Sequence, residues 1–164
     1  MKATALLTKQ HQEVRAIFKQ LEKGNGQSRA LLAKLATNLA AHMVIEQELF
    51  YPAVLKVKED LILESYEEHE VARFALERLL KTPVSDRTFM AKVITLKEII
   101  EHHVEEEEED IFPASEKALG GRSDDLCTKM KARFEETKSG GYQRALGKGG
   151  SVVTSAKAPQ AAAR

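Results

Sequence analysis

The chain has 164 residues, of which 43% are hydrophobic and 30% are charged, and its 25 basic and 25 acidic residues cancel. This length and composition suit a single compact domain with a substantial core. No apolar run approaches the roughly 20 residues needed to span a bilayer, and Lys and His occur too early for a signal peptide. We therefore expect a cytoplasmic protein with neither a membrane nor a nucleic-acid partner. The lone Cys127 excludes an internal disulfide.

Four segments repeat apolar residues at the spacing of an amphipathic helix, and one histidine interrupts each apolar stripe. Gly24–Gly26 ends the first segment and Thr82-Pro83 ends the third. Because short connections make consecutive helices antiparallel neighbours, the pattern predicts an all-α, up-down-up-down four-helix bundle. The inward positions, segment by segment, are Leu7, His11, Val14, Phe18 and Leu21; Leu32, Leu35, Leu39, His42, Glu46 and Leu49; Ile62, Ser65, His69, Ala72, Leu76 and Leu79; and Phe89, Val93, Leu96, Ile100, His103 and Glu107.

The bundle is expected to occupy residues 1–118, followed by two smaller regions. Residues 119–137 predict a short amphipathic accessory helix that packs on one end of the bundle. Residues 1–137 hold 20 basic and 25 acidic residues, a net charge of −5, whereas residues 138–164 carry basic residues and no acid. The Gly, Ala, Ser and Lys of this last stretch cannot bury enough surface to fold, so we expect a disordered basic tail.

The two halves of the chain form an internal repeat, and each half is one helical hairpin. A pseudo-twofold axis between the hairpins would bring equivalent residues together at the bundle centre. We also expect the helices to kink or end at the two prolines of the repeat, because proline removes a backbone hydrogen bond. A shift of 58 residues places His11 on His69, and a shift of 61 places His42, Glu46 and Pro52 on His103, Glu107 and Pro113.

The inward polar residues predict a two-metal site. Residues four apart on a helix lie on one face about 6 Å apart, so each His-x-x-x-Glu pair presents an imidazole and a carboxylate to the same space. A single inward histidine is more often a hydrogen-bonded core residue, but four of them with two carboxylates favour metal ligation, since unpaired carboxylates are costly to bury. The set suits two non-haem iron ions with an oxo or hydroxo bridge, each held by two histidines and sharing both glutamates, with positions open for a small ligand. The predicted ligands are His11, His42, Glu46, His69, His103 and Glu107.

Three further polar residues have open roles. His102 forms its own i, i+4 pair with Glu106, but its counterpart in the first half is Ala41, so we expect His102 to flank the centre rather than ligate a metal. Arg15 and Arg73 lie one turn beyond their histidines. They could hydrogen-bond acids near the metals, although solvated positions are the simpler interpretation.

This order of residues, with Phe50-Tyr51-Pro52 and Phe112-Pro113 after the glutamates, resembles the hemerythrin-like HHE cation-binding family over about residues 1–118. The resemblance implies a four-helix bundle with a non-haem di-iron centre. Members of that family include dioxygen carriers and sensors, nitric-oxide-responsive iron-repair proteins and peroxide-decomposing proteins. The dioxygen carriers have a second histidine where this chain has Arg73 and an aspartate where it has Glu107. The sequence is therefore more similar to the members with four histidines and two glutamates.

We expect a di-iron protein that binds or reacts with dioxygen, nitric oxide or peroxide, in a response to oxidative or nitrosative stress. An iron-holding sensor, an iron-donating repair module, a reversible dioxygen-binding hemerythrin and a metal-free bundle are the alternatives, and enzymatic activity and oligomeric state, monomer or dimer, stay open. A ferritin-like oxidase would need Glu-x-x-His pairs, which the sequence lacks. Because Arg73 replaces the fifth histidine, the two iron positions should be nearly equivalent. Such a centre is predicted to react with dioxygen rather than store it.

Overall fold

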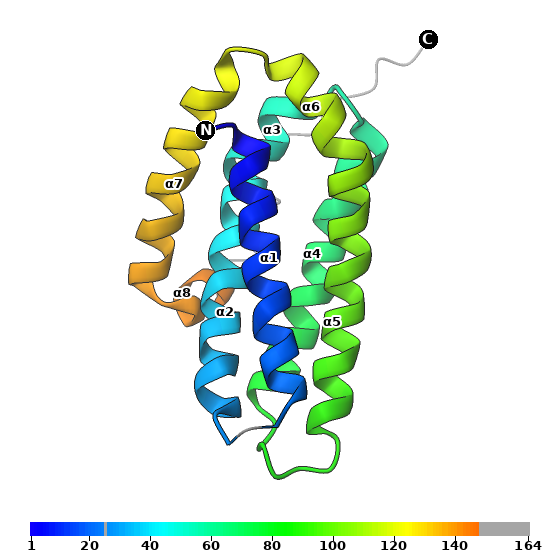
Figure 1. Cartoon of the computed structure of the whole chain (residues 1–164), viewed down its shortest axis with the longest axis vertical. Coiled ribbons are helices and arrows are strands. Elements are labelled where there is room, and N and C mark those ends of the chain that lie inside the picture. Colours follow the sequence, from blue (N-terminus) through cyan, green and yellow to red (C-terminus); the bar gives the residue numbers. More distant parts are fainter. Residues whose placement is uncertain (25, 148–164) are drawn as a thin grey trace.

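A computed structural model describes residues 1–24 and 26–147 of the chain, and every regular element in these ranges is helical. Helices α1, α2, α4 and α5 run side by side along the long axis of the molecule (Figure 1), which confirms the predicted all-α four-helix bundle. No helix in these ranges is long and apolar enough to cross a membrane. The elements are α1 (Ala3–Glu22), α2 (Ser28–Ile45), η1 (Glu46–Phe50), α3 (Tyr51–Val54), α4 (Glu59–Leu80), α5 (Phe89–Glu106), η2 (Glu107–Ile111), α6 (Phe112–Leu119), α7 (Arg122–Gly140) and α8 (Tyr142–Gly147).

The core consists of two apolar clusters, with a polar layer between them. One cluster, which includes Phe18 and Leu35, fills the end of the bundle near the α1–α2 and α4–α5 turns. The other cluster, which includes Leu7 and Phe50, fills the opposite end. Burial of each large apolar side chain stabilises the folded state by about 1.5–3 kcal/mol relative to leaving it exposed to water. The two clusters therefore hold the four helices in place around a layer of histidines and glutamates that would otherwise be costly to bury.

Two π-helical turns, η1 and η2, begin at the two glutamates of the repeat. The backbone N–H of Tyr51 donates to the carbonyl oxygen of Glu46, and that of Phe112 donates to Glu107, so each bond spans five residues. The prediction was a kink or an end at each proline, and the regular α-helices are interrupted by the π-helical turns just before the prolines but do not end there. They continue as α3 and α6, because the wider turn places each proline in the first turn of a new α-helical segment, where its missing N–H is tolerated.

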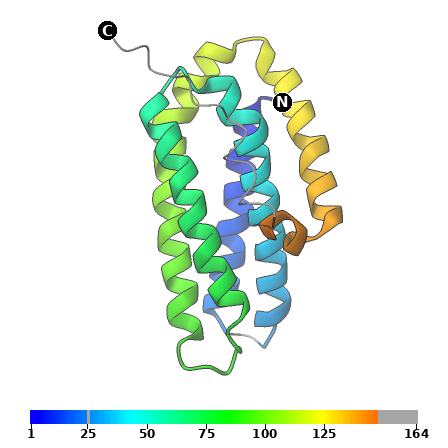
Figure 2. The ribbon, with the colours of Figure 1, turned by 180° about the vertical axis from the view of Figure 1, so that it is seen from behind.

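Helix α7 lies along the side of the bundle, against α2 and α1, and not on its end as predicted (Figure 2). Cys127, Met130 and Phe134 form its buried face. The guanidinium of Arg133 donates to both carboxylate oxygens of Glu48, over 2.6 and 2.9 Å. These contacts cover the first hairpin of the repeat, whereas α7 makes no contact of similar extent with the second hairpin, α4 and α5.

The predicted start of the tail at residue 138 is wrong. Helix α7 continues to Gly140, and α8 covers Tyr142–Gly147. Leu146 of α8 is buried against the apolar cluster that α2 shares with α1. Tyr142 and Ala145 of the same helix are partly buried against this cluster, so α8 docks through three apolar side chains. The rest of the predicted tail, 148–164, lies outside the described residues.

Candidate metal centre

The structure brings all six predicted ligands together in the polar layer between the two apolar clusters. Their side chains are buried, and none is more than 5% exposed. Helices α1, α2, α4 and α5 each contribute one histidine, and η1 and η2 each contribute their first residue, a glutamate. We call His11 and His42 the first pair, His69 and His103 the second pair, and Glu46 and Glu107 the shared glutamates.

The ligand atoms form two groups that the shared glutamates connect. The two Nε2 atoms of the first pair lie 3.1 Å apart, and those of the second pair lie 3.0 Å apart. Glu46 lies between the pairs, with Oε1 3.0 Å from His42 and Oε2 3.3 Å from His69. Glu107 Oε2 lies 3.3 Å from His11 and 3.6 Å from His103. Each glutamate therefore contacts both pairs, as a two-ion site requires.

Several oxygens of the centre are buried without a hydrogen-bond partner. These are both oxygens of Glu46 and Oε2 of Glu107, because their short distances to the imidazoles do not have hydrogen-bonding geometry. A buried carboxylate without a positive partner is strongly unfavourable. Imidazole nitrogens and carboxylate oxygens that converge in this way fit divalent or trivalent metal ions, and a cation would satisfy the unpaired oxygens.

Three of the four histidines are oriented by a hydrogen bond at Nδ1. His11 Nδ1 lies 2.8 Å from Glu108, His42 Nδ1 lies 2.8 Å from the amide oxygen of Gln10, and His103 Nδ1 lies 2.7 Å from Glu68, whereas His69 Nδ1 has no partner. With an acceptor at Nδ1, that nitrogen carries the proton, and the lone pair of Nε2 faces the centre. Metal-bound histidines have this second contact as a rule. These partners were not predicted from the sequence.

The electrostatics of the centre favour the charged forms of His11 and Glu46 despite burial. Burial lowers the pKa of His11, but the carboxylates of Glu107 and Glu108 outweigh it and raise this pKa to about 9. Burial raises the pKa of Glu46, but the neighbouring imidazoles, His42 foremost, hold this pKa well below its usual value. Glu46 is therefore an anion, and its partner is a proton on an imidazole or a metal ion that displaces the proton.

Tyr51 is a seventh polar residue of the centre, which the sequence analysis treated only as part of a family motif. Its hydroxyl donates to Glu107 Oε1 over 2.9 Å. The hydroxyl oxygen of Tyr51 also lies 3.3 Å from Nε2 of His69 and 3.5 Å from Nε2 of His103. The repeat counterpart of Tyr51 is Phe112, whose ring stacks on His11. The two pairs thus have the same ligand types but different surroundings.

The three residues with open roles occupy three different settings. His102 is 63% exposed and lies outside the six, next to Glu68 and Glu106. Burial and the nearby carboxylates of Glu68 and Glu64 raise the pKa of Glu106. The guanidinium of Arg15 donates to Glu108, the carboxylate that orients His11, so it does contact an acid near the centre.

Arg73 turns away from the six residues. Its guanidinium pairs with Glu70 and donates to the backbone oxygen of Leu146 in α8. The position that carries a fifth histidine in the dioxygen carriers is therefore used here to hold a surface helix.

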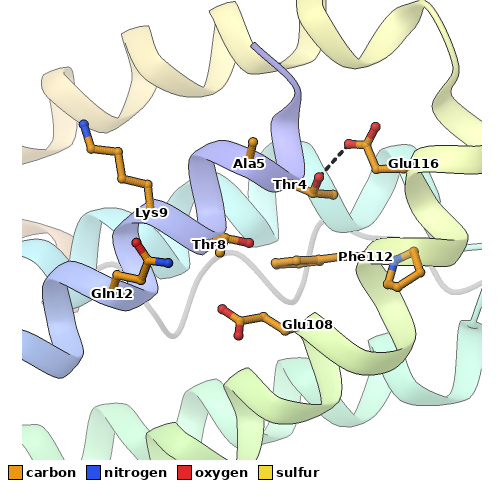
Figure 3. Close-up of a pocket in the computed structure, with 9 residues that line it drawn as sticks. Thr4, Ala5, Thr8, Lys9, Gln12, Glu108, Phe112 and Glu116 are labelled. Atoms are coloured by element: carbon orange, nitrogen blue, oxygen red, sulfur yellow. Dashed lines mark hydrogen bonds between the residues drawn. The ribbon is translucent and has the colours of Figure 1, made fainter.

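Among the cavities next to the centre in the described part of the chain, two differ greatly in size. The first has a volume of about 10 Å³, and apolar residues such as Val14 and Ile100 line it together with the four histidines. The second is an open groove of about 560 Å³ between α1 and α6 (Figure 3). Glu108 and Phe112, which contact the outer side of His11, form part of the groove, and Thr4 donates to Glu116 across its end.

Comparisons with known proteins agree with this geometry. The model of the Hemerythrin HHE cation binding domain family matches residues 2–115. A solved structure with a similar fold is that of a hemerythrin HHE cation binding domain-containing protein from Mycobacterium kansasii, with a TM-score of 0.79 and 26% identity over 91% of this chain and 99% of that chain. A search of curated proteins found no match. The family match spans most of the chain and all six residues of the centre, and the chain therefore belongs to the hemerythrin HHE cation-binding domain family, whose members bind metal ions.

Proposed function

We propose that the six residues of the centre hold two non-haem iron ions and that this di-iron centre reacts with a small oxidant: dioxygen, nitric oxide or peroxide. The observation that carries the proposal is the arrangement of the shared glutamates. Glu46 points one oxygen at each histidine pair, and neither oxygen has another partner. A single ion could not use both oxygens at once in this way, whereas two ions would.

The ligand types support iron among the first-row metals. Four imidazoles and two carboxylates make a mixed nitrogen and oxygen environment without thiolate, which suits iron in both its ferrous and ferric states. The metal would supply the capacity to exchange electrons with the oxidant. The protein contributes four histidine nitrogens and two shared carboxylates, so each ion would keep positions that the protein does not fill.

The size of the inner cavity supports a small substrate. A volume of about 10 Å³ is close to the least that holds one water molecule, and apart from the four histidines its lining is apolar. Only a molecule of two or a few atoms fits between Val14, Ile100 and the histidines. The open groove on the outer side of His11 is far larger, but none of the six residues lines it.

Tyr51 gives the centre a proton beside the second pair. Burial raises the pKa of this tyrosine well above its usual value, and the carboxylate of Glu107 adds to the effect. The hydroxyl therefore keeps its proton and donates it in a hydrogen bond to Glu107. By rotating its O–H away from Glu107, it can instead donate this one proton to a small ligand bound near His69 and His103, whose Nε2 atoms lie within 3.5 Å of the hydroxyl oxygen.

Iron loading followed by rapid mixing tests the proposal. The purified full chain, loaded with ferrous iron without air and then desalted, should retain about two ions per chain. Rapid mixing of this ferrous protein with dioxygen, peroxide or nitric oxide should change its optical spectrum. Removing dioxygen afterwards should not restore the reduced spectrum. Loss of all iron on desalting would contradict the metal assignment, and a spectrum reversed by removing the gas would assign the protein to dioxygen carriage.

A further inference from the structure

The second hairpin carries a group of metal-ligand side chains that the buried centre does not use. We call Glu68, His102 and Glu106 the surface cluster. Nε2 of His102 lies 3.4 Å from Oε1 of Glu68 and 3.8 Å from Oε1 of Glu106. One ligand atom of each residue lies within 4.8 Å of the other two. Because His102 is 63% exposed, an ion from solvent can reach the cluster directly.

The internal repeat shows what the same positions contain in the first hairpin. The shifts of 58 and 61 residues place the surface cluster on Gln10, Ala41 and Ile45. All three are buried, and none has an ionisable side chain. The first hairpin is covered by α7, so its outer positions are neutral or apolar, whereas the second hairpin has three ligand-type residues at the equivalent places.

Glu68 has more charge than its structural task requires. Its Oε2 accepts a hydrogen bond from Nδ1 of His103, over 2.7 Å, and Gln10 does the same for His42 over 2.8 Å. A neutral amide therefore suffices to orient a histidine of the centre. Orienting His103 therefore requires neither the negative charge of Glu68 nor its second oxygen, which faces His102.

Histidines are the partners of the two carboxylates of the surface cluster. Oε2 of Glu106 is buried without a hydrogen bond, and no lysine or arginine in the described part of the chain forms an ion pair with Glu68 or Glu106. Exposed acids on helices are common and need no metal. Two carboxylates that share one imidazole, with one oxygen buried and unpaired, are instead relieved by a divalent cation, because imidazole and carboxylate are ligands of first-row metals.

We propose that the surface cluster is a separate site for a divalent transition-metal ion and that it loads the buried centre. Glu68 connects the two, since one of its oxygens faces His102 and the other holds His103. An ion in the surface cluster would lie one side chain away from the second pair. The loading role rests on the proposed function, whereas metal binding by the surface cluster does not.

Cobalt binding to the metal-free full chain tests the site, because Co²⁺ is not oxidised during the titration. Calorimetry should detect one weaker ion per chain besides the tightly held ions. His102→Ala gives the position its repeat counterpart and should weaken that ion by at least about tenfold. Glu109→Gln, an exposed change in the same acidic run, should leave it unchanged. Equal binding by His102→Ala and the unchanged chain, at equal melting temperature, would overturn the proposal.

A second variant separates metal binding from helix structure. Glu68→Gln places at position 68 the glutamine that stands at its repeat counterpart, Gln10. This change keeps the hydrogen-bond acceptor for His103 and removes the negative charge. This variant should also lose the weaker ion. Retention of the weaker ion in both variants would show that the ion binds elsewhere.

Loading kinetics test the connection between the two sites. When metal-free chain is mixed with Co²⁺, the visible absorption of the tightly held ions should appear severalfold more slowly in His102→Ala, with the same final amplitude. Equal rates would overturn the loading role. If the chain binds the tightly held ions but no ion that depends on His102, the surface site alone is refuted. If it binds an ion that depends on His102 but no tightly held ions, the di-iron proposal alone is refuted.

Discussion

The first and second histidine pairs occupy equivalent positions of the repeat, but their surroundings differ. Next to the first pair, the Phe112 ring stacks on His11 at 5.7 Å, and α7 covers the hairpin. Next to the second pair, the hydroxyl of Tyr51 reaches both imidazoles, and the surface cluster is open to solvent. The repeat thus keeps the ligand positions and leaves access and hydrogen bonding free to differ. Two metal positions with the same ligand types can therefore behave differently.

Removing a shared glutamate should have the largest effect, because it affects both pairs at once. Glu46→Gln replaces the carboxylate that faces His42 and His69, so iron content should fall from about two ions per chain to almost none. Iron analysis after desalting measures this. Glu105→Gln, on an exposed position, is the control. If Glu46→Gln kept one ion, the two positions would not depend on a common ligand.

Removing one histidine should distinguish the centre from its flank. His103→Ala should lose most of the tightly held iron, because it removes one nitrogen of the second pair. His102→Ala should keep most of that iron, since His102 is exposed and outside the six residues. Iron analysis of the two variants side by side gives the answer. Equal losses would show that the repeat register assigns the wrong histidine.

A change in α8 should affect stability but not metal content. Leu146→Ala removes the buried side chain that docks α8 on the first hairpin, and should lower the free energy of unfolding by about 2 kcal/mol. Urea denaturation measures the loss, and the exposed Gln143→Ala serves as control. An unchanged unfolding free energy would mean that α8 adds nothing to the fold.

The smallest change should come from making the two pairs more alike. Tyr51→Phe gives position 51 an aromatic ring without a hydroxyl, as at Phe112, and removes one hydrogen bond to Glu107, at a cost of about 1 kcal/mol. The variant should still hold iron. Mössbauer spectra of the iron-loaded chain should show two distinct irons in the unchanged protein and more similar ones in the variant. Identical spectra would show that Tyr51 does not distinguish the pairs.

The sequence was sufficient to predict the bundle and which six residues meet in it. Helical spacing maps directly onto one face of a helix, and the repeat separated His103 from its neighbour His102. Gln10 and Glu68 could have been found by the same comparison, because each directly precedes the first histidine of its repeat and carries a side-chain oxygen. The presence of α8 was missed because its three apolar residues, Tyr142, Ala145 and Leu146, span too short a stretch to establish a helical period.

Tyr51 could not be predicted to face the centre from α-helical spacing. It lies five residues after Glu46, off the stripe that defines the inward face, and only the π-helical turn brings it back. The position of α7 along the side of the bundle also could not be predicted, since its apolar residues indicate that the helix packs on the bundle but not on which surface. Both depend on geometry that the periodic pattern does not contain.

The π-helical turns also fix the angular phase of everything that follows them. In a continuous α-helix, a residue five positions after a glutamate is rotated from it by about 140°, and would face away from the metals. Deleting one residue between Glu46 and Tyr51 would let the π-helical turn close as an α-helical one, with the tyrosine four residues after the glutamate and rotated from it by only about 40°. The connections between helices can differ in length, as the shifts of 58 and 61 residues show. Each π-helical turn accommodates one extra residue between a glutamate and its aromatic ring while keeping both on the same face of the helix.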